Sequence, residues 1–386
     1  MNDIRHEVIA LFDEVFDGAP EGVWSAPGLV NLIGEHTEYN KGFVLPFAIE
    51  RRTFSAVRIR TDRTLRVASA FAGELVELNL NDLSTTTLEG WSAVPFGVMR
   101  ALGHLGADLA AVPGVEIFVD SDLPAGTGLG SSASLECSLA LALNDTWGLG
   151  FDNDTLALAG QLAENIADGA PAGIMDPIAS LYGQPGQAML LDCRSRQITP
   201  VDLNFERDGL SLFVIDTATS HDNATAHSAE RRAACERGAS VLGIESLRDL
   251  TVDDLNRARH ALDDTTFRRV RHVVTENRRV LETARVLTEL GGAAIGEILD
   301  ASHRSLRDDF EVSTPELDLA VETALAHGAL GARMTGGGLG GCAIALIPRE
   351  NASLLRVAID GAFAEHGYGQ PDSFGVSASL GAQRDA

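Results

Sequence analysis

The segment LPAGTGLGSSASLE, residues 123–136, constrains the fold more than any other part of the chain. The apolar run before it, residues 115–119, predicts a strand, and the apolar run after it, residues 135–143, predicts a helix. Three glycines therefore lie in a strand-to-helix turn. Because glycine has no Cβ, backbone N–H groups can approach a ligand closely there, and the helix N-terminus adds a partial positive charge. The segment predicts a binding site for a polyphosphate.

This turn is not a P-loop, because no Gly-Lys-Ser/Thr follows the glycines. The whole chain contains one lysine, Lys41, and its other basic residues are arginines. A nucleotide would therefore be bound by backbone amides, hydroxyls and a metal ion. Ser131 and Ser132 stand at the expected helix start, where a hydroxyl can bind a phosphate oxygen or Mg²⁺. The alternative is that a serine serves as an ordinary helix N-cap.

Charge excludes several classes of partner. The 386-residue chain carries 30 Lys and Arg against 55 Asp and Glu, a net charge of −25. Such a surface repels nucleic-acid phosphates and anionic lipid, so we expect no nucleic-acid or membrane partner. An anionic small-molecule substrate stays possible because a local Mg²⁺ site can reverse the field.

Cysteine spacing and hydropathy indicate a cytoplasmic protein. The four cysteines fit no zinc-ligand spacing, and we expect buried free thiols rather than disulfides. The first residues, MNDIRHEVIALFDEVF, predict an amphipathic helix and lack the apolar core of a signal peptide. No apolar run reaches the roughly 18 residues that a membrane span needs.

Strand-like and helix-like segments mix without a regular βαβ rhythm, which predicts an α+β fold. The length favours two domains, and we place the boundary at residue 200, which gives domains 1–200 and 201–386. The first half is expected to hold most of the strands, beginning with two short β-rich runs at residues 23–25 and 30–33. The second half is expected to be rich in helices, at 230–242, 266–290, 293–306 and 315–327.

A polar loop lies in APGLVNLIGEHTEYNKGFVLP, residues 26–46. Glu35, His36 and Glu38 fall within a stretch of four residues in this segment. Several fixed donors and acceptors in one tight turn suit hydrogen bonding to a polyhydroxylated ligand. The alternative is a solvated turn capped by Asn31 or Asn40.

Two further segments carry candidate chemistry. Glu164 lies in a predicted helix, and Asp176 follows the loop GAPAG and precedes Pro177. Asp176 is either a helix N-cap or the carboxylate that accepts the proton of an attacking hydroxyl in phosphoryl transfer, with Glu164 as a ligand of Mg²⁺. In RMTGGGLGGCA, residues 333–343, five glycines in six positions predict a close backbone approach to a ligand, with a flexible surface loop as the alternative.

Taken together, the four segments resemble those of the galactokinases, a branch of the GHMP kinases (galactokinase, homoserine kinase, mevalonate kinase, phosphomevalonate kinase). The resemblance implies two α+β domains with the active site in the cleft between them, and a monomer that phosphorylates the C1 hydroxyl of galactose with ATP and Mg²⁺. It implies that Asp176 is catalytic, that Ser132 and Glu164 bind the metal, and that Glu35, His36, Glu38, Gly173 and Asp176 bind the sugar. It further implies that ATP is bound by Gly126, Gly128, Leu129, Gly130, Ser131, Ser132 and Ala133.

Three positions on the sugar side depart from the family pattern. Leu29 stands where the galactokinases carry an arginine that pairs with the catalytic Asp, Glu38 replaces an Asp, and Ser228 stands where a tyrosine is usual. Without that arginine, we expect the pKa of Asp176 to be raised. Three functions remain open: a galactokinase, a GHMP kinase for a different sugar or polyol, and a catalytically weak galactokinase-like ligand sensor.

Overall fold

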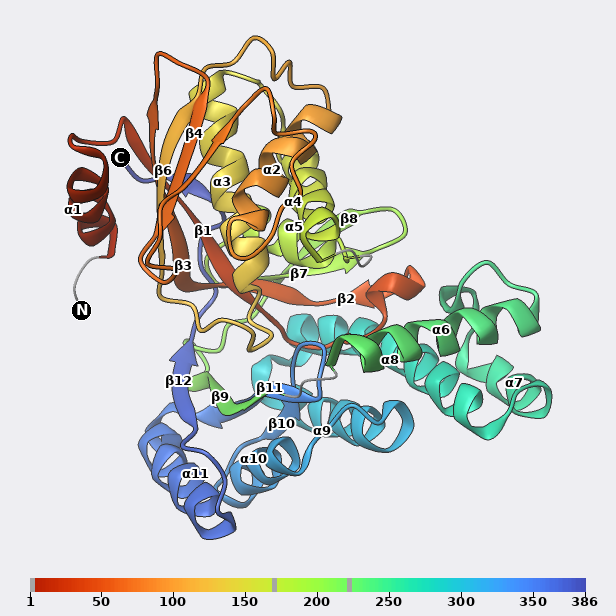
Figure 1. Ribbon diagram of the computed structural model, residues 1–386. Helices are drawn as coiled ribbons and strands as arrows, with labels where there is room; N and C mark the ends of the chain where they lie inside the picture. The colour runs from red at the N-terminus through yellow and green to blue at the C-terminus, as the bar shows by residue number, and fades with distance from the viewer. Residues whose placement is uncertain (1–3, 169–171, 221–223) are drawn as a thin grey trace.

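The computed structural model describes residues 4–168, 172–220 and 224–386 (Figure 1). Its first layer is a six-stranded sheet in the order β13-β1-β3-β6-β4-β5, antiparallel except where β4 pairs with β6. These strands are β1 (Gly22–Asn31), β3 (Pro46–Ile59), β4 (Thr64–Ser69), β5 (Val76–Asn79), β6 (Val115–Ser121) and β13 (Gln383–Arg384).

Helices cover both faces of this sheet, because the strands alternate their apolar side chains between the two faces (Figure 1). One face packs against α2 to α5 and the other against α1, which rests on Val23, Ala56 and Phe118. The helices are α1 (Ile4–Phe16), α2 (Ala93–His104), α3 (Ser131–Trp147), α4 (Asn153–Asp168) and α5 (Met175–Tyr182).

A second sheet, in the order β10-β11-β9-β12, forms the core of the other half and is antiparallel throughout. Its strands are β9 (Leu210–Ser220), β10 (Gly331–Met334), β11 (Gly340–Pro348) and β12 (Asp372–Val376). The helices of this half are α6 (Ala224–Leu242), α7 (Leu255–Ala261), α8 (Asp264–Leu290), α9 (Gly296–Ser305), α10 (Pro315–Ala326) and α11 (Ala352–His366).

A three-stranded antiparallel sheet of β2 (Phe43–Val44), β7 (Gln187–Asp192) and β8 (Gln197–Asp202) contacts β3 of the first half and α8 of the second (Figure 1). Several short helical segments complete the described structure. The 3₁₀ helices are η1 (Glu38–Asn40), η2 (Leu247–Asp249), η3 (Val252–Asp254), η4 (Gly292–Ile295) and η6 (Arg349–Asn351), and η5 (Leu306–Phe310) is a π-helix. The expected division at residue 200 falls inside β8 and stays a prediction.

The expected α+β architecture is confirmed, with one difference in the first strand. Two short β-rich runs were expected around Val23 and Val30, whereas β1 is one strand that continues through Pro27. A register shift between Pro27 and Leu29 lets the strand keep pairing with β3 on both sides of the proline. The cysteines are free, as expected. Among the described residues, none of the helices has the length and apolar character that a membrane crossing requires.

Candidate active site

A cavity of about 330 Å³ lies between the glycine turn before α3 and the glycine loop between β10 and β11. Asp176 and Glu164 line it as well, so three of the four segments singled out in the sequence meet here. No lysine or arginine is among the described residues that line it, which are Gly126, Thr127, Gly128, Gly130, Ser131, Ser132, Ala133, Glu164, Asp176, Thr219, Thr335, Gly337, Gly338, Leu339, Gly340 and Gly341.

The backbone of the glycine turn explains why its glycines are needed. Gly126, Gly128 and Gly130 have φ values of 72°, 81° and 69°, a region that residues with a Cβ rarely adopt. Gly130 is the N-cap of α3, so the alternative of a serine N-cap is wrong, and Ser131 and Ser132 form the first positions of the helix. Leu129 differs from its neighbours, because its side chain is buried in the core.

The two glycine loops pack against each other at the cavity. A Cβ on Gly128 would lie 3.3 Å from the Cα of Gly336, and a Cβ on Gly336 would lie 3.0 Å from the Cα of Gly128. A Cβ on Gly341 would lie 2.8 Å from the carbonyl oxygen of Thr127. The alternative of a flexible surface loop at residues 333–343 is therefore wrong, because side chains at these positions would force the loops apart.

Asp176 occupies the first turn of α5, and Ile174 is the N-cap of that helix. The N-cap alternative for Asp176 is therefore wrong, and its carboxyl faces the cavity instead. Burial, together with the smaller effect of the carboxylates of Glu38 and Glu35, raises the pKa of Asp176 to about 7. No cation among the described residues contributes to this shift, so the expected rise is confirmed.

Glu38 contacts the same helix from the polar loop. Its carboxylate accepts a hydrogen bond from the backbone N–H of Met175, at the N-terminus of α5. A Cβ on Gly173 would collide with that carboxylate, so glycine is needed there. Burial raises the pKa of Glu38, although the hydrogen bonds from Met175 and Ile174 act in the opposite direction. Residues 169–171, in the loop before α5, lie outside the described residues.

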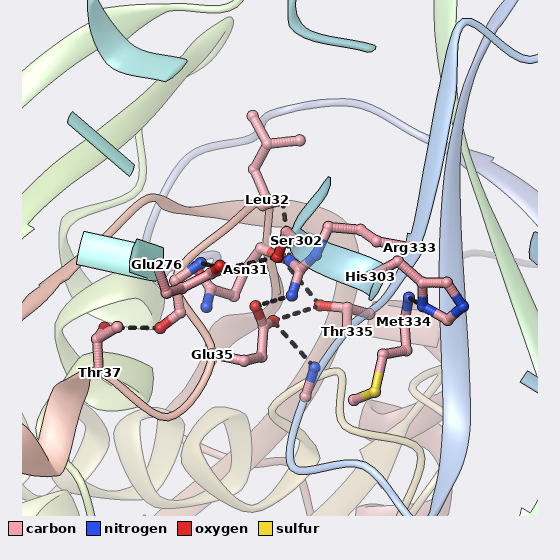
Figure 2. Close-up of polar contacts among 12 residues, drawn as sticks. Asn31, Leu32, Glu35, Thr37, Glu276, Ser302, His303, Arg333, Met334 and Thr335 are labelled. Carbon is pink, nitrogen blue, oxygen red and sulfur yellow. Dashed lines mark hydrogen bonds and ion pairs between the residues drawn. The ribbon is translucent and has the colours of Figure 1, made fainter. Parts of the chain in front are cut away.

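The Glu35 carboxylate is buried and accepts hydrogen bonds from three groups of the protein (Figure 2). The Arg333 guanidinium forms an ion pair with Oε2, while the Thr335 hydroxyl and the Gly336 N–H donate to Oε1 at 3.1 Å each. Burial raises the pKa of Glu35, and Arg333 opposes this rise. Neither Arg333 nor Thr335 was assigned a role from sequence, and only their place beside the glycines pointed to them.

His36 lies in the same loop with its ring stacked on Phe310, at a centroid distance of 4.4 Å. Its Nδ1 is 3.1 Å from the Tyr39 hydroxyl. Burial, together with the positive charges of His272 and Arg231, lowers the pKa of His36 to about 3, so the ring is neutral at physiological pH. His272 was missed in the sequence, because its helix position carries no local signal for a contact with a loop 237 residues away.

Three family models match successive parts of the chain: "Galactokinase galactose-binding signature" at residues 10–59, "GHMP kinases N terminal domain" at 96–184 and "GHMP kinases C terminal" at 286–365. A galactokinase of Streptomyces coelicolor is 46% identical over 97% of this chain and 96% of its own length. A Mycobacterium tuberculosis galactokinase is 39% identical over 90% of this chain and 95% of its own length. The chain belongs to the galactokinase family.

Solved structures agree with this membership of the galactokinase family. The crystal structure of Lactococcus lactis galactokinase complexed with galactose superposes with a TM-score of 0.93, at 31% identity over 98% of this chain and 99% of the other. Methanococcus jannaschii mevalonate kinase, at 19% identity and a TM-score of 0.68 over 94% of this chain and 99% of the other, shares the fold.

Leu29, where the galactokinase family carries arginine, is buried in a small apolar cluster with Ala179 and Met189. Leu29 therefore leaves the sugar side without the guanidinium that galactokinases carry at this position. Another cation lies near the loop that holds Glu38, because the Arg232 guanidinium carbon is 4.7 Å from the centre of the Tyr39 ring. The positive charge of Arg232 acts to lower the pKa of Glu38. Ser228, at the usual tyrosine position, is exposed.

Proposed function

We propose that this protein transfers the γ-phosphoryl group of ATP to the C1 hydroxyl of galactose. The observation that carries the proposal is the cavity in which the glycine turn, Ser132, Glu164 and Asp176 come together. Membership of the galactokinase family supports the choice of sugar. A monomer is the proposed working unit.

In this proposal, the backbone N–H groups of the turn and the N-terminus of α3 bind the ATP phosphates. The Ser132 hydroxyl and the Glu164 carboxylate would hold Mg²⁺, whose preference for oxygen ligands they fit. The metal would offset the negative charge of the phosphates in a cavity whose described lining has no basic side chain.

Asp176 accepts the proton of the attacking hydroxyl in the proposed reaction. A pKa of about 7 suits this task, because a general base works best when its pKa is near the operating pH. The loop that carries His36 and Glu38, together with Gly173, forms the proposed sugar side. Glu38 both reaches the N-terminus of α5 and raises the pKa of Asp176, so the sugar side would act on the base directly.

A kinase for a different sugar is the second candidate, and Leu29 and Glu38 favour it because both alter the sugar side. An ADP-release assay across aldoses, ketoses and polyols separates the two. We expect galactose to be turned over at about 1–100 s⁻¹, the usual range of kinases. Turnover of another sugar at that rate with galactose inactive would favour the second candidate, and no turnover on any sugar would contradict both.

A further inference from the structure

The second half of β1 contacts both helices that carry the proposed reaction machinery. The Ser134 hydroxyl of α3 donates to the carbonyl oxygen of Ala26 at 2.6 Å, and the Ser180 hydroxyl of α5 donates to that of Pro27 at 2.7 Å. Both hydrogen bonds are buried, and they lie beside the register shift that accommodates Pro27. β1 therefore joins the helix that follows the glycine turn to the helix that carries Asp176.

Leu29 extends this connection to the glycine turn itself. Its N–H donates to the carbonyl oxygen of Leu129 at 2.9 Å. A Cβ on Gly130 would lie 2.5 Å from the Cδ2 atom of Leu29, so the leucine side chain packs directly on the N-cap of α3. Leu29 is buried and is not one of the described residues that line the cavity, so it supports the turn from behind.

Leu29 also connects to α5 through apolar packing. It shares a small buried cluster with Ala179 of that helix, and Met175 is packed against the same cluster. Met175 immediately precedes Asp176 in the first turn of α5. One apolar side chain thus links the N-cap of α3, where the phosphates are proposed to bind, to the helix that carries the proposed base.

The spacing between these two elements matters for the reaction. The glycine turn is the proposed site of the phosphates, and Asp176 is the proposed acceptor of the proton from the attacking hydroxyl. Reacting atoms have to approach to about 3–3.5 Å in the right direction before transfer can occur. A change in the distance between the turn and α5 would therefore alter the approach of the hydroxyl to the γ-phosphoryl group.

We propose that Leu29 is a positioning residue for phosphoryl transfer: its side chain sets the spacing between the glycine turn and α5, so that its truncation slows transfer without weakening nucleotide binding. This inference rests on the proposed kinase function. Leu29 would act through its volume, because a leucine side chain has no charge to offer the phosphoryl group.

The test compares Leu29→Ala and Leu29→Val with the control Val8→Ala. Val8 is fully buried where α1 packs on the first sheet, in a cluster that holds none of the described residues lining the cavity. Single-turnover rates are measured with ATP and the sugar that the ADP-release assay identifies. We expect the transfer rate to fall at least about tenfold in Leu29→Ala and about threefold or more in Leu29→Val, since a misplacement of about 1 Å can cost about 10²-fold. Val8→Ala should stay within about twofold of wild type.

Urea unfolding shows that the control is a fair one. Truncation of either buried side chain leaves a cavity, so Leu29→Ala and Val8→Ala should both unfold at a lower urea concentration than wild type. Leu29→Met nearly conserves the volume of the side chain, and we expect it to keep the transfer rate within about threefold of wild type. If Leu29→Ala does not fold, Leu29→Val carries the same comparison.

Calorimetric binding of ADP without sugar separates positioning from nucleotide affinity. We expect the Kd of the truncated variants to stay within about threefold of wild type, because the turn keeps its contact with the second glycine loop. Transfer rates within about twofold of wild type in both truncated variants, a loss of ADP affinity as large as the loss of rate, or an equal loss of rate in Val8→Ala or Leu29→Met would each overturn the inference. A wild-type protein that binds ADP but phosphorylates no sugar would instead contradict the proposed function.

Discussion

At the scale of single residues, Asp176 carries the most distinctive property of the site. Its carboxyl has a pKa of about 7 because it is largely removed from solvent and lies near the carboxylates of Glu38 and Glu35. A guanidinium at position 29 would oppose this shift, but Leu29 is apolar and buried. The base is therefore about half ionised at neutral pH.

The pH dependence of activity follows from that pKa. Only the ionised carboxylate of Asp176 can accept a proton, so we expect kcat/KM to fall as the pH is lowered through about 7. His36, whose pKa is about 3, stays neutral over this range and adds no second step. A pH–rate profile from 5 to 9 measures the inflection. A plateau that extends unchanged down to about pH 5 would contradict the raised pKa.

Replacement of Asp176 by Asn should separate activity from stability. We expect kcat to fall about 10²- to 10⁴-fold, the usual contribution of a general base. Between pH 3.8 and about 7, Asp176 is protonated in the folded protein but ionised in the unfolded chain. The free energy of unfolding therefore falls as the pH rises through that window. At pH 8 the variant should therefore gain about 1–2 kcal/mol, a value discounted for the partial exposure of the carboxyl.

Urea unfolding and steady-state kinetics measure both effects of Asp176→Asn. Asp154→Asn is the matched control, since Asp154 is exposed and its side-chain oxygen can still accept the Tyr182 hydroxyl after the change. Full activity in Asp176→Asn would remove Asp176 from the reaction. A loss of stability at pH 8 would contradict the account of its pKa.

At the scale of elements, the glycine turn and the glycine loop act as one unit. Their close approach depends on positive φ angles at Gly128 and Gly336 and on the missing Cβ atoms. The individual turn could be predicted from the strand before it and the helix after it. Its partner across the cavity lies about 200 residues further along the chain, and local pattern contains no information on that pairing.

Gly128→Ala tests the contact between the loops, with Gly148→Ala as its control. Both glycines have positive φ, 81° and 65°, so each substitution should cost about 1 kcal/mol of backbone strain. Only the Gly128 Cβ would meet the other loop, because nothing lies within 4 Å of a Cβ at Gly148. We expect the KM for ATP to rise about tenfold in Gly128→Ala alone. Equal KM values in the two variants would show that the contact does not matter for the nucleotide.

Local sequence pattern shows which segments are distinctive but not which distant residues meet, and this explains which parts of the site could be predicted from the sequence. Asp176, Glu164 and Ser132 were singled out because each stands in a distinctive local segment, and all three line one cavity. The ion pair between Glu35 and Arg333 joins residues 298 positions apart, so only the folded chain reveals it. The continuity of β1 was missed because Pro27 interrupts the β-rich pattern, whereas the structure accommodates it with a register shift.

At the scale of the whole molecule, the two large sheets share one apolar cluster. Val30 and Phe47 from the first sheet pack in the same cluster as Val214 and Ile344 from the second. Residues near the end of the chain return to the first sheet, where β13 pairs with β1 (Figure 1). Both features join the two halves, and neither follows from composition or periodicity.

Arg52 joins this returning segment to the first sheet. Its guanidinium donates to the carbonyl oxygens of Leu380 and Gly381 at 2.8 and 2.6 Å and to the Ser25 hydroxyl at 2.8 Å. We expect Arg52→Ala to lower the free energy of unfolding by about 1.5–3 kcal/mol, because hydrogen bonds from a charged donor are lost. Chemical denaturation measures the change. Arg207→Ala, at a residue 68% exposed, is the control, and an equal loss there would contradict the role of Arg52.

The identity of the phosphorylated atom is the most direct test of the proposed function. Wild-type protein is incubated with ATP, Mg²⁺ and galactose, and the product is followed by ³¹P NMR with coupling to the sugar protons. We predict one new phosphate monoester coupled to the anomeric proton, formed in equal amount to ADP and at least about 10²-fold more slowly with Asp176→Asn. A phosphate on any other hydroxyl, or ADP release without a sugar phosphate, would contradict it.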